Sequence, residues 1–100
     1  MATVLTSGSE EIAAGDTVRL YCDFGDCRQL IEGATIASYT VTCTGSGTPP
    51  TVSGAQLDYS YRVSAKFTAT TAGQFSAVYT VTLSDLDQTV IKRTGNLVVK

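Results

Sequence analysis

Residues 59–69 read YSYRVSAKFTA, and apolar and polar side chains alternate along the whole stretch. Because successive side chains of a β-strand point to opposite faces of a sheet, a period of two predicts a strand with one buried face. A strand with its other face in water is typical of antiparallel sheets. The phase that we expect to face a core consists of Tyr59, Tyr61, Val63, Ala65, Phe67 and Ala69.

The same alternation of apolar and polar residues occurs in further stretches on both sides of this one. Short segments rich in Gly, Ser, Thr and Asp separate these stretches. The further strands that the alternation predicts are 17–24, 34–43, 74–84, 88–93 and 96–99. In the second of them, one face is expected to carry Ala37, Tyr39, Val41 and Cys43. Thr94-Gly95 indicates a bulge or bend between the last two.

Two stretches interrupt the pattern. Residues 26–33 predict a short helical turn or an irregular corner that ends at Gly33. Residues 44–56 contain three glycines and both prolines, which predicts a loop with at most a short edge strand near 51–52.

Five or six strong strands and one or two weak ones, joined by short turns and with no crossover helix, indicate an all-β protein. We expect an antiparallel immunoglobulin-like β-sandwich of about seven strands, with a small barrel as the alternative. A chain of 100 residues is sufficient for one domain. The expected organisation is a polar N-terminal arm at 1–14 followed by a single sandwich domain at 15–100.

Composition excludes several classes of partner. Seven Lys and Arg are scattered along the chain against nine Asp and Glu, for a net charge of −2, so binding to nucleic acid is not expected. No apolar stretch approaches the ~18 residues of a membrane-spanning helix. The segment MATVLTSGSEE at 1–11 also lacks the features of a signal peptide. These observations predict a protein that is made in a cytoplasm and kept there or packaged into a larger assembly.

Catalytic chemistry is not expected either. The chain has no His, which excludes Ser–His and Cys–His nucleophiles, and Lys66 is expected on a solvent-facing phase. GSG at 45–47 is not followed by the residues of a phosphate-binding loop. Asp23, Asp26 and Glu32 do not have the spacing of a calcium loop. The sequence therefore predicts a protein that is not an enzyme and binds no cofactor or metal.

The segment YCDFGDC at 21–27 raises the question of a thiol site. A zinc site built on Cys22, Cys27 and Cys43 would need a fourth ligand, and the chain has no His to supply it. Cys22 lies on the apolar phase of its strand, so buried, reduced thiols are the expected state. A bond between Cys22 and Cys43 under oxidising conditions remains an open alternative.

The best candidates for a contact surface come from two places. Tyr21 shares a phase with Arg19 and Asp23 and is therefore expected to be at least half exposed. Tyr and Arg are residue types that protein interfaces favour. The loop with Pro49 and Pro50 is the second place, and these five residues form the predicted interface.

Several short motifs add a resemblance. They are an Asp-aromatic pair, a Leu-x-x-Gly-x-x-Ile-x-Ser corner, an Ala-Gly-x-aromatic turn, a Val-Thr-x-Ser-Asp hairpin and a closing Leu-x-Val, at 23–24, 30–38, 72–75, 81–85 and 97–99. In this combination the chain resembles small immunoglobulin-like virion proteins of tailed bacteriophages, the group often called fiber–tail adaptor proteins. It departs from them at Phe24, where relatives often have Trp, and at Gln88, where many have Gly.

The resemblance implies a structural protein of the virion, assembled in the host cytoplasm. Its partners would be other virion proteins of the tail, fiber or head–tail junction, and a homo-oligomer in the particle is also implied. A capsid decoration protein is the first alternative. A carbohydrate-binding β-sandwich module is the second, although the expected inward phases of most Tyr and Phe count against it.

Overall fold

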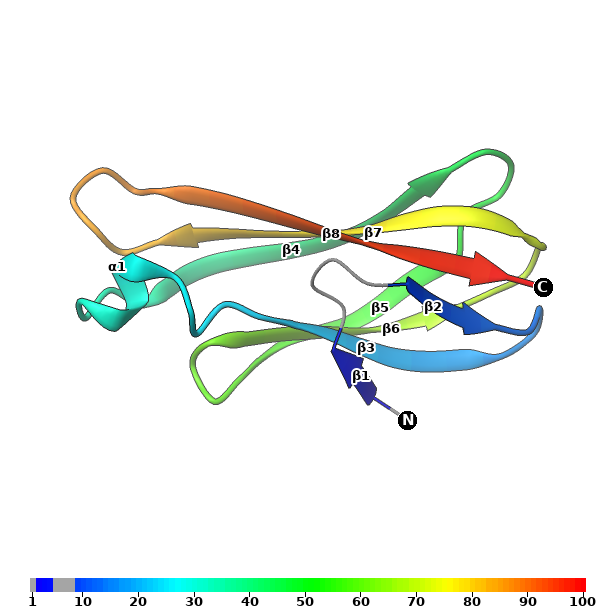
Figure 1. The fold of residues 1–100 in the computed structure, drawn as a ribbon, viewed down its shortest axis with the longest axis horizontal. Helices are drawn as coiled ribbons and strands as arrows, with labels where there is room; N and C mark the ends of the chain where they lie inside the picture. The colour runs from blue at the N-terminus through cyan, green and yellow to red at the C-terminus, as the bar shows by residue number, and fades with distance from the viewer. Residues whose placement is uncertain (1, 5–8) are drawn as a thin grey trace.

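The fold, seen here in a computed structural model that describes residues 2–4 and 9–100, is almost entirely β-structure (Figure 1). Its one short helix, α1, spans Arg28–Ile31 in the described part of the chain. The strands are β1 (Ala2–Val4), β2 (Ser9–Ile12), β3 (Thr17–Asp23), β4 (Ile36–Gly45), β5 (Thr51–Asp58), β6 (Arg62–Thr68), β7 (Gly73–Leu83) and β8 (Val90–Val99). No helix of the described residues is long and apolar enough to cross a membrane.

The strands form two four-stranded sheets in the orders β1-β3-β6-β5 and β2-β8-β7-β4. Figure 1 shows them stacked as two layers, with α1 and the β7–β8 turn at one end and the C-terminus at the other. Strands β3, β6 and β5 facing β4, β7 and β8 reproduce the strand order of an immunoglobulin constant-type sandwich. The predicted all-β immunoglobulin-like sandwich is confirmed, and β1 and β2 add parallel pairings at its edges.

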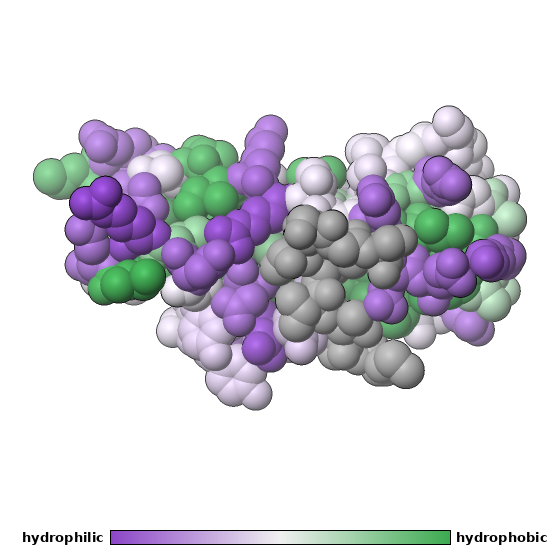
Figure 2. Space-filling view, viewed as in Figure 1, coloured by the Kyte–Doolittle hydropathy of each residue, from purple (hydrophilic) through white to green (hydrophobic). Residues whose placement is uncertain are grey.

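The core lies between the sheets and is built from the predicted alternation. Every second residue of β7 from Phe75 to Leu83 is buried, and Val63, Ala65 and Phe67 of β6 are fully buried. Antiparallel register sets Val18 of β3 opposite Phe67, so the apolar phases of neighbouring strands coincide. On the side seen in Figure 2, hydrophilic residues separate the apolar patches of the described residues.

Tyr59 and Tyr61 do not belong to this core, and their expected inward orientation is wrong. Their side chains are 72% and 36% exposed, and β6 begins only at Arg62. Tyr59 and Ser60 are the two central residues of the β5–β6 hairpin turn, with φ of 55° and 64°. The turn ends the alternation before it reaches the tyrosines.

The predicted loop at 44–56 is also corrected. Residues 51–58 form β5, which pairs with β6 along most of its length. The pairing shifts between Ser53 and Gln56, and Gly54 has a φ of 61°. This bulge breaks the period of two and explains why the sequence did not reveal the strand.

Two smaller predictions differ from the structure. Ala37 is exposed because the β4–β7 pairing shifts between Ile36 and Ser38, whereas Tyr39 faces inward as expected. The bulge expected at Thr94-Gly95 is absent, since β8 pairs with β7 without a shift. Gly95 lies buried opposite Ala77, where a small residue suits the close approach of the strands.

Two segments of the expected arm at 1–14 pair with the sheets in the described part of the chain. Ala2–Val4 pairs with β3 of one sheet, and Ser9–Ile12 pairs with β8 of the other. Residues 1 and 5–8 of the expected arm lie outside the described residues. The sheets therefore begin well before residue 15, because backbone pairing does not require the apolar alternation that the arm lacks.

The hydroxyl of Tyr79, at the centre of the core, leads to a first prediction. The residue is fully buried, and its hydroxyl has no hydrogen-bond partner within the described part of the chain. An unpaired buried polar group costs about 1–3 kcal/mol, so Tyr79→Phe should raise the free energy of unfolding by about 1 kcal/mol. Urea unfolding should show the gain, and Tyr39→Phe, at a half-buried site, should change little. A loss of stability in Tyr79→Phe would mean that the hydroxyl is hydrogen-bonded in solution.

Candidate interaction surface

The outer face of the β1-β3-β6-β5 sheet gathers the polar and aromatic side chains that the alternation turns away from the core. Register pairs Arg19 with Lys66, Tyr21 with Ser64, and Asp23 with Arg62. The structure thus brings Arg19, Tyr21 and Asp23 onto one face, as the sequence predicts. We call this surface the tyrosine–arginine face and define it by Arg19, Tyr21, Asp23, Asp58, Tyr59, Tyr61, Arg62 and Ser64.

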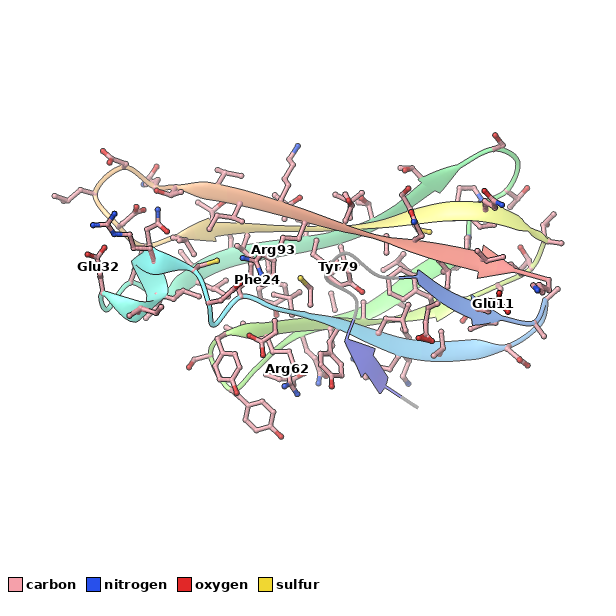
Figure 3. The ribbon with its side chains drawn as sticks, viewed as in Figure 1. Glu11, Phe24, Glu32, Arg62, Tyr79 and Arg93 are labelled. Carbon is pink, nitrogen blue, oxygen red and sulfur yellow. The ribbon has the colours of Figure 1, made fainter. Side chains whose placement is uncertain are left out.

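Arg62 is at the centre of the aromatic part of this face. Its guanidinium carbon lies 4.1 Å from the centroid of the Tyr21 ring, 5.3 Å from that of Tyr59 and 6.0 Å from that of Tyr61. Asp23 Oδ2 lies 3.7 Å from its Nη2 atom. A cation over aromatic faces is attracted to them, so Arg62 fixes the orientation of rings from three different positions. Figure 3 shows Arg62 beneath the sandwich, on the side away from the other sheet.

The turn that carries Tyr59 has an unusual backbone. Both central residues, Tyr59 and Ser60, have positive φ, a combination for which Asn-Gly is the preferred sequence. Tyr61 N donates to Asp58 O at 3.3 Å and closes the turn. The Tyr59 and Tyr61 rings stack with centroids 6.1 Å apart and 29° between their planes. The strained turn therefore presents a stacked pair of tyrosines to solvent from the end of a rigid hairpin.

A hydrogen-bond network fixes the polar part of the face. Arg19 Nη1 donates to Ser64 Oγ at 3.0 Å and to Gly54 O at 3.3 Å. Ser64 Oγ donates to Asp58 Oδ2 at 2.9 Å, and Gln56 Nε2 donates to Asp58 Oδ1 at 2.7 Å. The network joins β3, β6 and β5, so the face is ordered before any partner arrives.

The two prolines of the predicted interface are not part of this face. Pro50 is buried and Pro49 is half-buried. Both precede β5 at Thr51, which pairs with Thr68, whereas the tyrosines lie at the other end of the same hairpin. Because its ring is covered by this chain, Pro50 offers no surface to a partner.

The three cysteines are free, with Cys22 and Cys27 buried and Cys43 half-buried. Burial raises the pKa of Cys22 to about 11 and that of Cys43 to about 11. Burial also raises the pKa of Cys27, an effect opposed by Arg93, whose Nη2 donates to Sγ at 3.3 Å. Protonated thiols are poor nucleophiles and poor metal ligands. Among the described residues, no group of three or more His, Cys, Asp or Glu is placed to hold a metal ion.

These raised pKa values predict a loss of stability in alkali. Between pH 9 and 11 the folded protein retains the Cys22 proton that the unfolded chain releases, so the free energy of unfolding falls as pH rises. A shift from 9.0 to about 11 at this fully buried thiol corresponds to about 2–3 kcal/mol. Urea unfolding from pH 8 to 11 should show the decline, and Cys22→Ala should reduce its slope. An unchanged slope in Cys22→Ala would contradict the assignment to this thiol.

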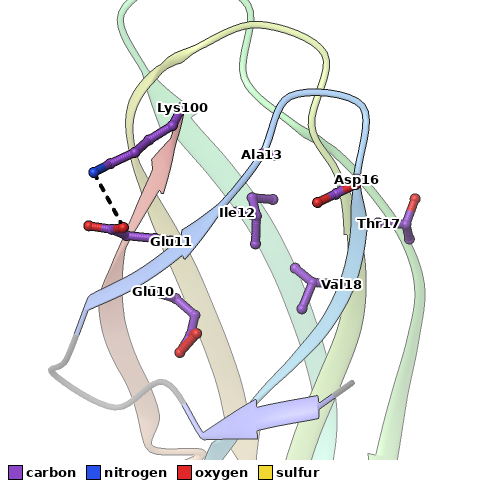
Figure 4. A pocket seen from close by; sticks show the side chains of 8 residues that line it. All are labelled: Glu10, Glu11, Ile12, Ala13, Asp16, Thr17, Val18 and Lys100. Atoms are coloured by element: carbon purple, nitrogen blue, oxygen red, sulfur yellow. Dashed lines mark ion pairs between the residues drawn. The ribbon is translucent and has the colours of Figure 1, made fainter.

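An open hollow lies near the C-terminus, between β2 and the start of β3 (Figure 4). It has a volume of about 480 Å³, and both carboxylates and apolar side chains line it. Its lining residues are Glu10, Glu11, Ile12, Ala13, Asp16, Thr17, Val18 and Lys100. Lys100 Nζ pairs with Glu11 Oε2 at 3.4 Å, which leaves Glu10 and Asp16 to make this open surface acidic.

The fold and this surface define a small immunoglobulin-like β-sandwich with an ordered aromatic face. Comparisons with protein-family models and with curated protein sequences give no match. Among solved structures, the chain is similar to the cysteine protease inhibitor EhICP2 from Entamoeba histolytica, with a TM-score of 0.56 and 7% identity over 99% of this chain and 96% of that one. The solution structure of amebosin matches with a TM-score of 0.47 and 13% identity over 100% and 99% of the two chains. At such low identity, the likeness to the inhibitor shows the shared fold alone.

Sequence reasoning missed Tyr59 and Tyr61 as surface residues. It placed Arg62 on the solvent-facing phase of its strand but did not include it in the predicted interface. The signal that could have revealed the two tyrosines is Asp58-Tyr59-Ser60-Tyr61, four residues of turn length between two strands. It would have been recognised only if β5 had been, because a hairpin turn requires a strand on each side.

Proposed function

We propose that this chain is a non-enzymatic structural protein of a virion, an adaptor that holds neighbouring tail or head–tail proteins. The observation that carries the proposal is the tyrosine–arginine face, in which Arg62 is held among Tyr21, Tyr59 and Tyr61 at the surface. A few residues carry most of the binding energy at protein interfaces, and Tyr and Arg are among the types enriched at those positions. A face already ordered by its own contacts loses little conformational entropy when a partner binds.

The placement in a virion rests on the resemblance of the sequence motifs to phage adaptor proteins. Assembly in the host cytoplasm and several copies per particle belong to the same proposal. A capsid decoration protein would use the same kind of face. The two differ in their location on the particle, which labelled antibodies against the chain would show by electron microscopy.

A carbohydrate-binding module is the second candidate, and a specific observation favours it. Tyr59 and Tyr61 are stacked and exposed, not buried. Sugar rings bind to exposed aromatic faces, and such a pair offers one. The two candidates share a surface but require different ligands.

One experiment separates them. The chain would be tested for binding to each protein encoded by the genes that flank its own, and in parallel on a glycan array. We expect nanomolar to micromolar binding to a tail or head–tail protein, weakened at least tenfold in Tyr59→Asn. Asn is chosen because it tolerates the positive φ of the turn while removing the ring.

The matched control is Leu86→Asn, which removes an even more exposed apolar side chain from the β7–β8 turn. It should bind as the unmodified chain does. Retention by glycans that depends on Tyr59 would favour the carbohydrate-binding module. The adaptor proposal fails if no protein encoded beside the chain binds it, or if Tyr59→Asn binds with full affinity.

A further inference from the structure

Strand β4 is the outer strand of its sheet, and it lacks the usual protection of such an edge. Among the described residues, it pairs with β7 alone. Its sequence, IASYTVTCTG, contains no charged residue and no proline. Natural edge strands are normally short, bulged, proline-containing or charged, because an open edge can pair with another chain. From Ser38 to Gly45 the register with β7 is regular, so these eight residues of β4 form an open strand edge without a bulge.

The other sheet edges in the described part of the chain are less suited to pairing. Strands β1 and β2 have three and four residues. Strand β5 is interrupted by the register shift between Ser53 and Gln56, where Gly54 has a left-handed backbone. Among the described edge strands, β4 is therefore the one that is long, pairs in regular register over residues 38–45 and carries no charged residue.

The outward backbone groups of β4 have no backbone partner among the described residues. Within the described residues, no backbone hydrogen bond joins residues 38–45 to any segment other than their own sheet neighbour. In an antiparallel ladder, alternate residues turn their N–H and C=O groups away from the strand that they pair with. These groups of β4 are available to another strand at the edge.

The pattern of side chains along this edge fits a second copy of the same strand. Threonine and serine occupy one phase on both sides of Val41, at Ser38, Thr40, Thr42 and Thr44. An antiparallel alignment about Val41 sets Thr40 opposite Thr42 of the second copy, and Ser38 opposite Thr44. Hydroxyl pairs of this kind stabilise neighbouring strands, whereas like charges directly opposite would destabilise them. A charged partner strand would find no complementary charge on this edge.

We propose that β4 is a self-association edge: two copies pair their β4 strands antiparallel about a two-fold axis at Val41 and so form one continuous sheet of eight strands. The pairing is isologous, since the same residues contribute from each copy. The net charge of −2 causes little repulsion between the copies. The edge is separate from the tyrosine–arginine face, so the inference does not depend on the proposed function.

The test is the mass of the isolated chain in solution as a function of concentration. Sedimentation equilibrium from about 10 µM to about 1 mM should show a rise from the monomer mass of 10.5 kDa toward twice that value. In Thr40→Lys/Thr42→Lys, the alignment sets lysine opposite lysine at two positions, and the dimer should weaken at least tenfold. Thr40→Glu/Thr42→Glu should weaken it similarly.

A mixture of the two variants tests whether positions 40 and 42 of the two copies meet across the edge. Lysine of one copy then lies opposite glutamate of the other, so the mixture should form a one-to-one dimer that neither variant forms alone. The matched control is Thr94→Lys/Asn96→Lys, which adds the same charge on the same outer face but on β8, away from the edge. The control should dimerise as the unmodified chain does.

The proposal is overturned if the chain remains monomeric across this range, if the lysine variant dimerises as before, or if the mixture remains monomeric. Hydrogen exchange distinguishes a second copy from another protein at the edge. If the β4 amides that point away from β7 exchange fast in the isolated chain and become protected only within the assembled particle, another protein occupies the edge. That result also overturns pairing with a second copy.

Discussion

Phe67→Ala should lower the free energy of unfolding by about 3–5 kcal/mol, because it removes a large side chain from the centre of the core. Phe67 is fully buried on β6, where its neighbours in register are Val18 of β3 and Val52 of β5. Its ring meets that of Tyr79 from the opposite sheet, with centroids 6.4 Å apart and 62° between the planes. The substitution therefore opens a cavity at the contact between the sheets. The total free energy of unfolding of a domain of this size is about 5–15 kcal/mol, so the loss is a large share of the stability.

Thermal unfolding followed by circular dichroism should show a fall in Tm of more than about 12 °C. The control is Tyr61→Ala, since Tyr61 and Phe67 occupy the same phase of the sequence but Tyr61 lies at the surface. Its effect should stay within about 1 kcal/mol. Equal losses in the two variants would contradict the placement of Tyr61 outside the core.

Arg93→Ala should be the most damaging substitution of a charged residue, at about 2–3 kcal/mol. Arg93 extends from β8 to the corner that follows β3 (Figure 3). Its Nη1 donates to Asp23 O at 2.9 Å and to Asp26 Oδ1 at 2.8 Å, and its Nη2 donates to Cys27 Sγ at 3.3 Å. Its guanidinium carbon also lies 5.1 Å from the centroid of the Phe24 ring. One side chain thus joins the two sheets at this end.

Most of this loss should come from the carbonyl and thiol contacts, because the Asp26 side chain is 74% exposed and surface ion pairs contribute little. Arg93→Lys should recover only part of the stability, since an ammonium group cannot form the same set of divergent hydrogen bonds. Lys92→Ala, at the exposed neighbouring position, should change stability by less than about 0.5 kcal/mol. Urea unfolding of the three variants measures the difference. If Arg93→Ala is no more harmful than Lys92→Ala, the corner is held by other contacts.

The sequence was sufficient for the fold class because the core strands obey a strict period of two. In β7 the buried residues are those that the alternation predicts, from Phe75 to Leu83. It was insufficient where backbone geometry interrupts the period. The bulge in β5 and the turn at Tyr59 both change which way a side chain points without changing the residue types.

For the surface, the sequence correctly grouped Arg19, Tyr21 and Asp23, since three alternate residues of one strand must share a face. It could not supply Arg62 or the tyrosine pair, because their proximity depends on the pairing of β3 with β6. Nor could it predict that Pro50 is buried, since a loop residue has no periodicity from which burial follows.

The parallel pairing of β2 with β8 has a mechanical consequence. Ser9 lies beside Asn96 and Ile12 beside Val99, so force applied before β2 and after β8 draws the two strands past each other lengthwise. Hydrogen bonds loaded in shear must break together, whereas bonds at an unzipping hairpin break one at a time. We expect the domain to resist stretching between its ends, and deletion of residues 1–12 to lower the rupture force in single-molecule pulling. A link in an assembly that is put under tension would gain from this geometry.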